Sequence, residues 1–157
     1  MPELARVAAQ SPPMRLPAPV TGDPTRVTVD VTWGRIQPMR LHSEVETIGE
    51  LELIEHLQAG LPLIDTRSAE SFATATIAGA LLIPFGEIAE RHDEIDSTVP
   101  AILFCNGPQC PATPSAVRTL LEVGHPPRML RYYRGGMHDW ITLGLPVTHR
   151  LEGESTS

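Results

Sequence analysis

The strongest constraint on the fold is an alternation of short apolar runs with helical segments, which begins at residue 43 and continues almost to the end of the chain. Each apolar run has the length of a buried strand and is bounded by turn residues. Strands are expected at residues 61–65, 80–83, 101–104 and 128–132. Short apolar strands separated by helices imply a parallel sheet. We therefore predict an α/β fold, doubly wound, with a mainly parallel sheet of about five strands and helices on both faces.

The first helix of this pattern is expected to begin near Thr47. Thr47 is followed three residues later by Glu50, which is the spacing of a capping box. Leu51, Ile54 and Leu57 then recur at helical spacing, so we expect them to face the core. Further helices are expected at residues 68–72, at 87–91, after the strand at 101–104, and around Trp140.

The N-terminal part of the chain has a different composition. Residues 1–24 hold six prolines, which fix the backbone and remove amide donors, so we expect an irregular arm. Apolar and polar residues alternate over 26–33, which predicts one short strand attached to the main domain. We divide the chain into an N-terminal extension (1–42), one domain (43–149) and a flexible tail (150–157). The extension could form a homodimer by docking on a neighbouring subunit.

Charge and cysteine content narrow the classes of partner. The formal net charge is -7, which argues against a nucleic acid as the main partner. No apolar run is long enough to span a bilayer, and the first residues lack the order of a secretory signal, so we expect no membrane partner and a cytoplasmic location. A reducing compartment would keep Cys105 and Cys110, the two cysteines of the chain, available as thiols.

Cys105 is the residue whose position most suggests chemistry. It ends a predicted buried strand and precedes a helix, and ligands collect at the carboxyl ends of strands in open α/β sheets. A helix N-terminus favours an anion, so we expect the pKa of the Cys105 thiol to fall and the thiolate to act as a nucleophile. The alternative is an inert thiol that packs in the core.

Three segments of the chain resemble the signatures of rhodanese-like domains, in the family's order. The first is Leu63-Ile64-Asp65-Thr66-Arg67 with Glu70, Phe72 and Ile77-Ala78-Gly79-Ala80; the second is Phe104-Cys105 and its loop; the third is Arg134-Gly135-Gly136-Met137 with Trp140 and Gly144-Leu145-Pro146-Val147. The resemblance spans most of the chain and implies the fold of single-domain sulfurtransferases.

The resemblance also implies a mechanism. The Cys105 thiolate would attack the outer sulfur of thiosulfate or another sulfane donor, form a persulfide, and pass that sulfur to a thiol or to cyanide. The backbone amides of the loop would bind the persulfide. The loop residues are Asn106, Gly107, Pro108, Gln109 and Cys110. No cofactor and no metal are expected, because the histidines and cysteines lack the paired spacing of a zinc site.

The chain departs from the family pattern at two places, and the second of them, in the loop, bears on the chemistry. Ala75-Thr76 replace a Gly-His pair, which we expect to be a local structural change. No Lys or Arg lies between Cys105 and Arg118, so the donor is expected to be less charged than thiosulfate or protein-bound. Cys110 either packs beneath the loop or resolves the persulfide by forming a disulfide with Cys105.

Arg67 and Asp65 are the remaining candidate site residues. Both stand at the end of the predicted strand 61–65, so they could lie near the mouth of the site and position the substrate or the loop. The structural alternative for Arg67 is an ion pair with a neighbouring carboxylate such as Glu70, and Asp65 would tie the strand end to the loop.

Other functions remain as alternatives. Phosphatases and arsenate reductases use a cysteine in a related fold, but their loop ends in an Arg that binds the oxyanion, and no such Arg is present. A rhodanese-like binding or regulatory module with little turnover is the non-enzymatic alternative. Retention of Cys105 favours the enzyme.

Overall fold

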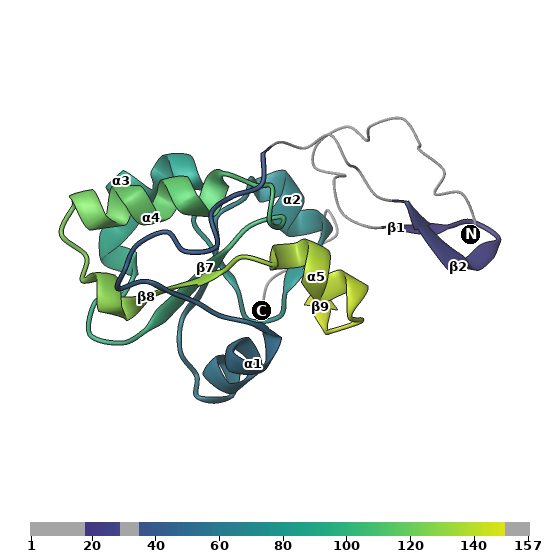
Figure 1. Ribbon diagram of the computed structural model, residues 1–157, viewed down its shortest axis with the longest axis horizontal. Helices are drawn as coiled ribbons and strands as arrows, with labels where there is room; N and C mark the ends of the chain where they lie inside the picture. Colours follow the sequence, from purple (N-terminus) through teal and green to yellow (C-terminus); the bar gives the residue numbers. More distant parts are fainter. Residues whose placement is uncertain (1–17, 29–34, 150–157) are drawn as a thin grey trace.

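The central feature of the computed structural model, which describes residues 18–28 and 35–149, is a five-stranded sheet (Figure 1). All of its strand pairings are parallel, in the order β3-β8-β7-β4-β6. The strands are β3 (Glu46–Thr47), β4 (Leu63–Asp65), β6 (Leu81–Leu82), β7 (Ala101–Phe104) and β8 (Leu130–Tyr133). The predicted α/β fold with a mainly parallel sheet is confirmed.

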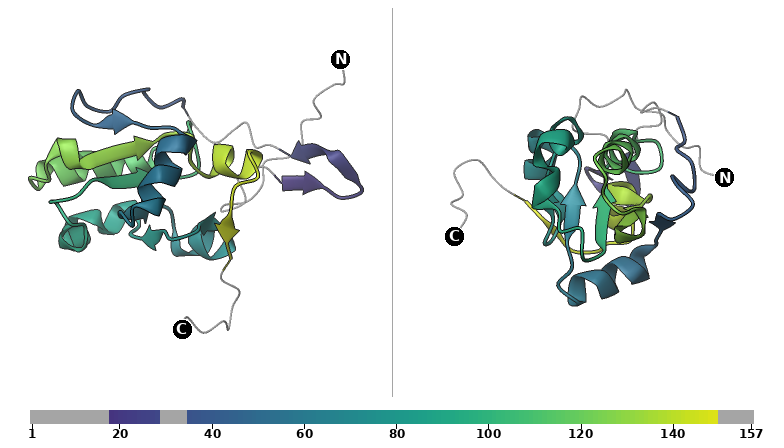
Figure 2. Two further views of the ribbon diagram at one scale, coloured as in Figure 1. Left: turned by 90° about the horizontal axis from the view of Figure 1, so that it is seen from below. Right: turned by 90° about the vertical axis from the view of Figure 1, so that its left-hand side faces the viewer.

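Helices cover both faces of this sheet, as predicted (Figure 2). Ala101 and Leu103 of β7 pack in one buried cluster with residues of α3 and α4, whereas Ile102 and Phe104 pack in a second cluster with residues of α1 and α5. The two clusters follow from the alternation of side chains along a strand. The helices are α1 (Glu50–Gln58), α2 (Ala69–Thr74), α3 (Ile88–Arg91), α4 (Ala112–Glu122) and α5 (Gly136–Thr142).

Shorter elements complete the domain. A two-stranded antiparallel sheet joins β5 (Thr76–Ile77) to β9 (Val147–Thr148), which ties the C-terminal end of the domain to the segment after α2. Single turns of 3-10 helix are η1 (Phe85–Glu87), η2 (His92–Glu94) and η3 (Pro127–Met129). Over residues 18–28 and 35–149, no helix has the length and apolar character needed to cross a membrane.

The N-terminal region contains a hairpin of β1 (Ala18–Val20) and β2 (Asp23–Thr28). The first three residues of the strand predicted at 26–33 belong to β2, which pairs with β1 and not with the main sheet. The rest of that predicted strand, most of the proline-rich arm and the C-terminal tail lie outside the described residues.

The start of α1 differs from the prediction. Thr47 belongs to β3, whose pairing with β8 occupies it, so the proposed capping box of Thr47 and Glu50 is wrong. The helix begins after Gly49 instead, where the Gly49 amide donates to Glu52 Oε2 at 3.1 Å. The helical face is also shifted, because Leu53 is fully buried while Leu51 is 76% exposed.

Candidate active site

Cys105 follows the last residue of β7, at the carboxyl edge of the sheet and next to the first turn of α4. It is only 1% exposed. The strand end before it is fixed by Thr66, whose amide and hydroxyl both donate to the carbonyl oxygen of Phe104, at 3.1 and 3.0 Å. Cys105 is therefore held at the position that parallel α/β folds use for ligand binding.

The loop between Cys105 and α4 is anchored through its carbonyl groups. The amides of Met137 and His138 at the start of α5 donate to the carbonyl oxygens of Cys105 and Asn106, at 3.0 and 2.8 Å. The amide of Gln37 donates to Pro108 O at 2.7 Å. Within the loop, the amide of Cys110 donates to Gly107 O at 3.0 Å. Two segments distant in the sequence, together with one hydrogen bond inside the loop, thus hold this loop in one conformation.

The Cys105 thiol donates to the carbonyl oxygen of Cys110, with its sulfur 3.5 Å from that oxygen, so the two cysteines of the loop are in contact. Burial raises the pKa of the Cys105 thiol well above its ordinary value, and the neighbouring Cys110 raises it further. The hydrogen bond from Cys105 lowers the pKa of Cys110 to about 6, with further help from the amides of Ala112 and Asn106 and from the charge of Arg67. The expected fall in the pKa of Cys105 is therefore wrong, because burial of its thiol raises that pKa.

Asp65 and Arg67 form a buried network beneath the loop. The Arg67 guanidinium donates to both carboxylate oxygens of Asp65, with the shortest distance 2.8 Å, and its Nη2 also donates to the carbonyl oxygen of Ala75. The Thr76 hydroxyl donates to Asp65 Oδ2 at 2.8 Å. Ala75 and Thr76, the departure from the family pattern, therefore take part in holding Arg67.

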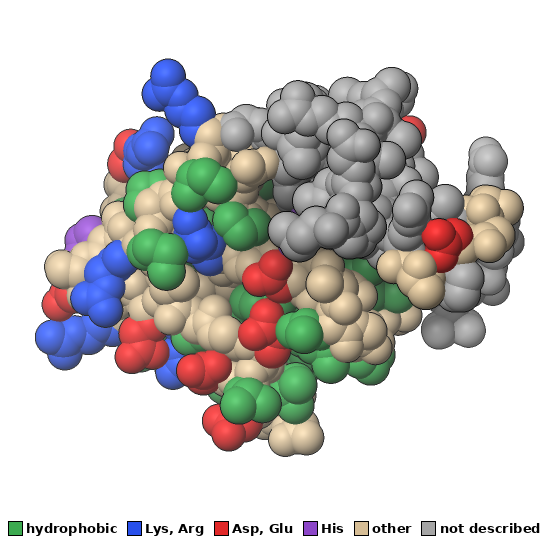
Figure 3. Space-filling model, turned by 45° about the vertical axis from the view of Figure 1, so that its right-hand side comes forward, with side chains coloured by type: hydrophobic (Ala, Val, Ile, Leu, Met, Phe, Trp, Pro, Cys, Tyr) green, Lys and Arg blue, Asp and Glu red, His purple; other side chains and the backbone are tan. Residues whose placement is uncertain are grey.

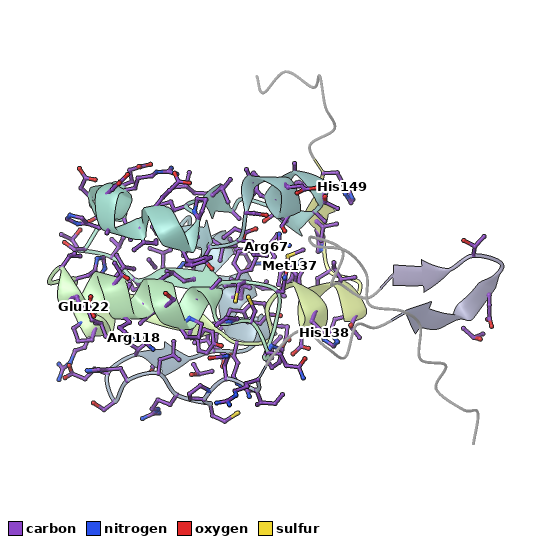
Figure 4. The ribbon with its side chains drawn as sticks, turned by 90° about the horizontal axis from the view of Figure 1, so that it is seen from above. Arg67, Arg118, Glu122, Met137, His138 and His149 are labelled. Atoms are coloured by element: carbon purple, nitrogen blue, oxygen red, sulfur yellow. The ribbon has the colours of Figure 1, made fainter. Side chains whose placement is uncertain are left out.

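Arg67 links this network to the loop. Its Nη1 donates to Asn106 Oδ1 at 3.2 Å, and its side chain is nearly inaccessible to solvent. The salt bridge of Arg67 is with Asp65, and not with Glu70 as the structural alternative suggested. Arg118, the first basic residue after the loop in the sequence, lies well along α4 and away from the loop end where Arg67 lies (Figure 4). The cation beside the thiols thus comes from the neighbouring strand.

Sequence reasoning missed two threonines that support Cys105. The amide and the hydroxyl of Thr113, in the first turn of α4, hydrogen-bond the Cys105 sulfur. The Thr113 and Thr66 hydroxyls are 2.9 Å apart, and both residues are fully buried. A hydroxyl residue in the first turn after a cysteine loop was the available signal, since such a side chain can face the loop.

Gly136, a residue of the closing signature Arg134-Gly135-Gly136-Met137, lies against the cysteine loop. It has a φ of +58°, and a Cβ at this position would overlap the carbonyl oxygen of Cys105 and approach Gly107 N to 2.8 Å. Glycine is thus required here for both its backbone conformation and its small size. The Gly135-Gly136 pair in the closing signature was the signal for this close approach.

Deeper in the loop region, two polar atoms are buried without a hydrogen-bond partner among the described residues. They are Gln109 Oε1 in the loop and the Tyr132 hydroxyl on β8. Burial raises the pKa of Tyr132 and the nearby sulfur of Cys105 adds to that effect, so the phenol stays protonated beneath the site.

Comparisons with known proteins agree with this geometry. The family model described as Rhodanese-like domain matches residues 50–143. A curated relative, the HTH-type transcriptional regulator Rv0324 of Mycobacterium tuberculosis, is 33% identical over 108 residues. The match covers 68% of this chain but 46% of that regulator, so this chain spans about half the length of the relative.

Solved structures with the same fold include three bacterial proteins. A full-length protein from Lactobacillus plantarum superposes with a TM-score of 0.58 at 19% identity, covering 66% of this chain and 87% of that one. The rhodanese-like domain of an Anabaena protein gives 0.57 at 19% identity, covering 71% and 84%. Thiosulfate sulfurtransferase from Pseudomonas aeruginosa gives 0.56 at 25% identity, covering 68% and 21%. The segment matched by the family model contains the cysteine loop, the Asp65–Arg67 network and α5, and the chain belongs to the family of rhodanese-like domains.

Proposed function

We propose that this protein is a sulfurtransferase that takes a sulfane sulfur onto Cys105 as a persulfide and passes it to a thiol or to cyanide. The supporting observation is the set of backbone amides turned toward the two sulfur atoms of the loop: Thr113 toward Cys105, and Asn106 and Ala112 toward Cys110. Preorganised amides stabilise a negatively charged sulfur without any reorganisation during the reaction.

The contact between Cys105 and Cys110 allows the first proton transfer of the reaction. The Cys105 thiol donates to the carbonyl oxygen of Cys110, and the lowered pKa of the neighbouring Cys110 thiol favours its thiolate, which can take the Cys105 proton. As Cys105 attacks the outer sulfur of a donor, that proton passes to Cys110 and the donor's remaining half leaves, as sulfite from thiosulfate. The buried Cys105 thus acts as the nucleophile although its own pKa is raised, because a base lies in contact with it.

The surroundings of the loop bear on the choice of donor. The Arg67 guanidinium is committed to Asp65, Ala75 and Asn106, so little of its hydrogen-bonding capacity remains for a doubly charged anion. On the described part of the face shown in Figure 3, basic and acidic side chains lie among one another. The commitment of the Arg67 guanidinium favours a persulfide donor over thiosulfate. Both cysteines are free thiols, and this state suits the cytoplasm, a compartment that keeps thiols reduced.

Steady-state kinetics test this proposal. The protein is expected to transfer sulfur from glutathione persulfide to cyanide faster than from thiosulfate, with ping-pong kinetics, and Cys105→Ser is expected to abolish both reactions. Failure of the wild-type protein to transfer sulfur from either donor, with the fold intact, would contradict the sulfurtransferase proposal.

A regulatory module is the second candidate, and the similarity to a transcriptional regulator favours it. In this case the loop would take up a sulfur or a partner without turnover. One result separates the two candidates. A regulatory module forms the Cys105 persulfide at most once, and its Cys105 does not return to the free thiol when an acceptor is added.

A further inference from the structure

The sulfur of Cys110 lies among the backbone amides that we propose to bind the persulfide. Backbone amides of Ala112 and Asn106 donate to it. The Cys105 thiol donates to the carbonyl oxygen of the same residue, Cys110, with its sulfur 3.5 Å from that oxygen. A sulfur bound to Cys105 lies about 2.05 Å from the Cys105 sulfur, so it is carried next to Cys110.

We propose, on the basis of the function proposed above, that Cys110 resolves the Cys105 persulfide and releases hydrosulfide. The Cys110 thiolate attacks the inner sulfur, which is the Sγ of Cys105. A bond forms between the two cysteine sulfurs, and the bond from Cys105 to the outer sulfur breaks. The outer sulfur leaves with the bonding electron pair and its hydrogen as HS⁻, so the sulfane sulfur is reduced while the two cysteines are oxidised to a disulfide.

Contact and charge both favour this step over a merely structural role for Cys110. Cys105 is fully buried, whereas Cys110 is partly exposed. The Arg67 guanidinium stabilises the anion on Cys110 and donates to Asn106 at the start of the same loop. Attack on the donor leaves the outer sulfur of the Cys105 persulfide as an anion, and the proton held by Cys110 passes to it. Cys110 then becomes a thiolate, the form that attacks a disulfide or persulfide sulfur.

The cycle requires a second substrate. The Cys105–Cys110 disulfide must be reopened by an external dithiol, which becomes oxidised to its own disulfide as both cysteines regain their protons. The inferred activity is therefore the reduction of sulfane sulfur to sulfide at the expense of a dithiol, and the inferred partner is a protein or small molecule of the dithiol class.

The experiment compares wild-type protein with Cys110→Ser and Cys105→Ser after reduction and removal of all reductant. Each protein is mixed with thiosulfate or with glutathione persulfide and desalted. Released sulfide and the non-reduced intact mass are then measured. We expect the wild type to release about one sulfide per chain and to lose two hydrogen atoms in mass, a stoichiometry set by one resolving thiol. Cys110→Ser lacks the thiolate that takes up the Cys105 proton, so it should gain the sulfur more slowly than the wild type, but it should then keep one extra sulfur on Cys105 and release little sulfide.

Three results would overturn this proposal. Equal persulfide retention and equal sulfide release by wild type and Cys110→Ser would reject the resolving step and leave the sulfurtransferase proposal standing. Trapping of the added sulfur on Cys110 in Cys105→Ser, with disulfide in the wild type, would reverse the two roles. Absence of added sulfur and of disulfide in every protein would reject the proposed function itself. Cys110→Ala, together with thermal unfolding of each variant, shows whether any loss comes from misfolding.

Discussion

The backbone of Gly136 lies directly against the carbonyl group of Cys105, so that the turn between β8 and α5 packs against the cysteine loop. Gly136→Ala is expected to displace the loop, because its Cβ would overlap Cys105 O and press on Gly107 N. The positive φ adds about 1–2 kcal/mol of strain. We predict that this variant folds with reduced stability and forms the Cys105 persulfide at least tenfold more slowly, as measured by sulfur transfer to cyanide.

Gly144→Ala is the matched control for this prediction. Gly144 also has a positive φ, +71°, but a Cβ there would meet no atom within 4 Å. It should therefore lose about 1–2 kcal/mol of stability and keep the rate of persulfide formation. Equal rates in the two variants would show that contact with the loop is unimportant.

Arg67→Met is predicted to destabilise the protein by about 3–5 kcal/mol, because it leaves the buried Asp65 carboxylate without its charged partner. Arg67→Lys keeps the charge but cannot donate to Asp65, Ala75 and Asn106 together, so it should recover only part of this loss. Denaturant unfolding measures both. Arg91→Met, which breaks an exposed pair with Glu94, is the control and should have a much smaller effect.

Thr113→Val removes a hydroxyl that hydrogen-bonds the Cys105 sulfur. This hydrogen bond lowers the pKa of Cys105 against the opposing effect of burial, so its loss should raise the pKa of Cys105 further and slow persulfide formation. The cost in stability should be about 0.5–1.5 kcal/mol. Thr119→Val, on the same helix with its hydroxyl bonded to Ser115 O, should leave the rate unchanged. An unchanged rate in Thr113→Val would contradict the role of Thr113.

Alkylation of the native protein is predicted to begin at Cys110. Because the pKa of Cys110 is lowered to about 6, its thiolate fraction, and with it the rate of modification by iodoacetamide, should rise as the pH increases through about 6. In Cys105→Ala the strongest cause of the lowered pKa is absent, so the midpoint should move upward toward the ordinary cysteine value of about 8.5. A midpoint unchanged by this substitution would show that the two thiols do not interact.

The sequence patterns predict the frame of the site well, because they depend on local rules. The strand at Ala101–Phe104, its cysteine and the following helix stand as expected, since a buried strand before a Gly-Pro loop has few alternative folds. The hydrogen-bond cap of Ser68 on α2 and the left-handed Gly60 after α1 are equally local features.

Features that depend on distant pairing were not predictable in this way. The choice of Asp65 over Glu70 as the partner of Arg67 depends on how α2 and β4 are placed, and the hydrogen bond from Arg67 to Asn106 joins residues 39 positions apart. The predicted start of α1 was wrong because β3 pairs with β8 over a long distance in the sequence, and this pairing places Thr47 in a strand. The pKa order of the two cysteines likewise depends on burial, which the loop sequence does not contain.

The most direct test of the central claim is the mass of Cys110→Ser after exposure to glutathione persulfide, with peptide fragmentation under non-reducing conditions. We predict one added sulfur atom on Cys105, which is lost when cyanide is added and is absent in the Cys105→Ser, Cys110→Ser double variant. If neither folded Cys110→Ser nor folded wild type gains a sulfur or forms a disulfide with glutathione persulfide or with thiosulfate, persulfide chemistry at Cys105 is contradicted.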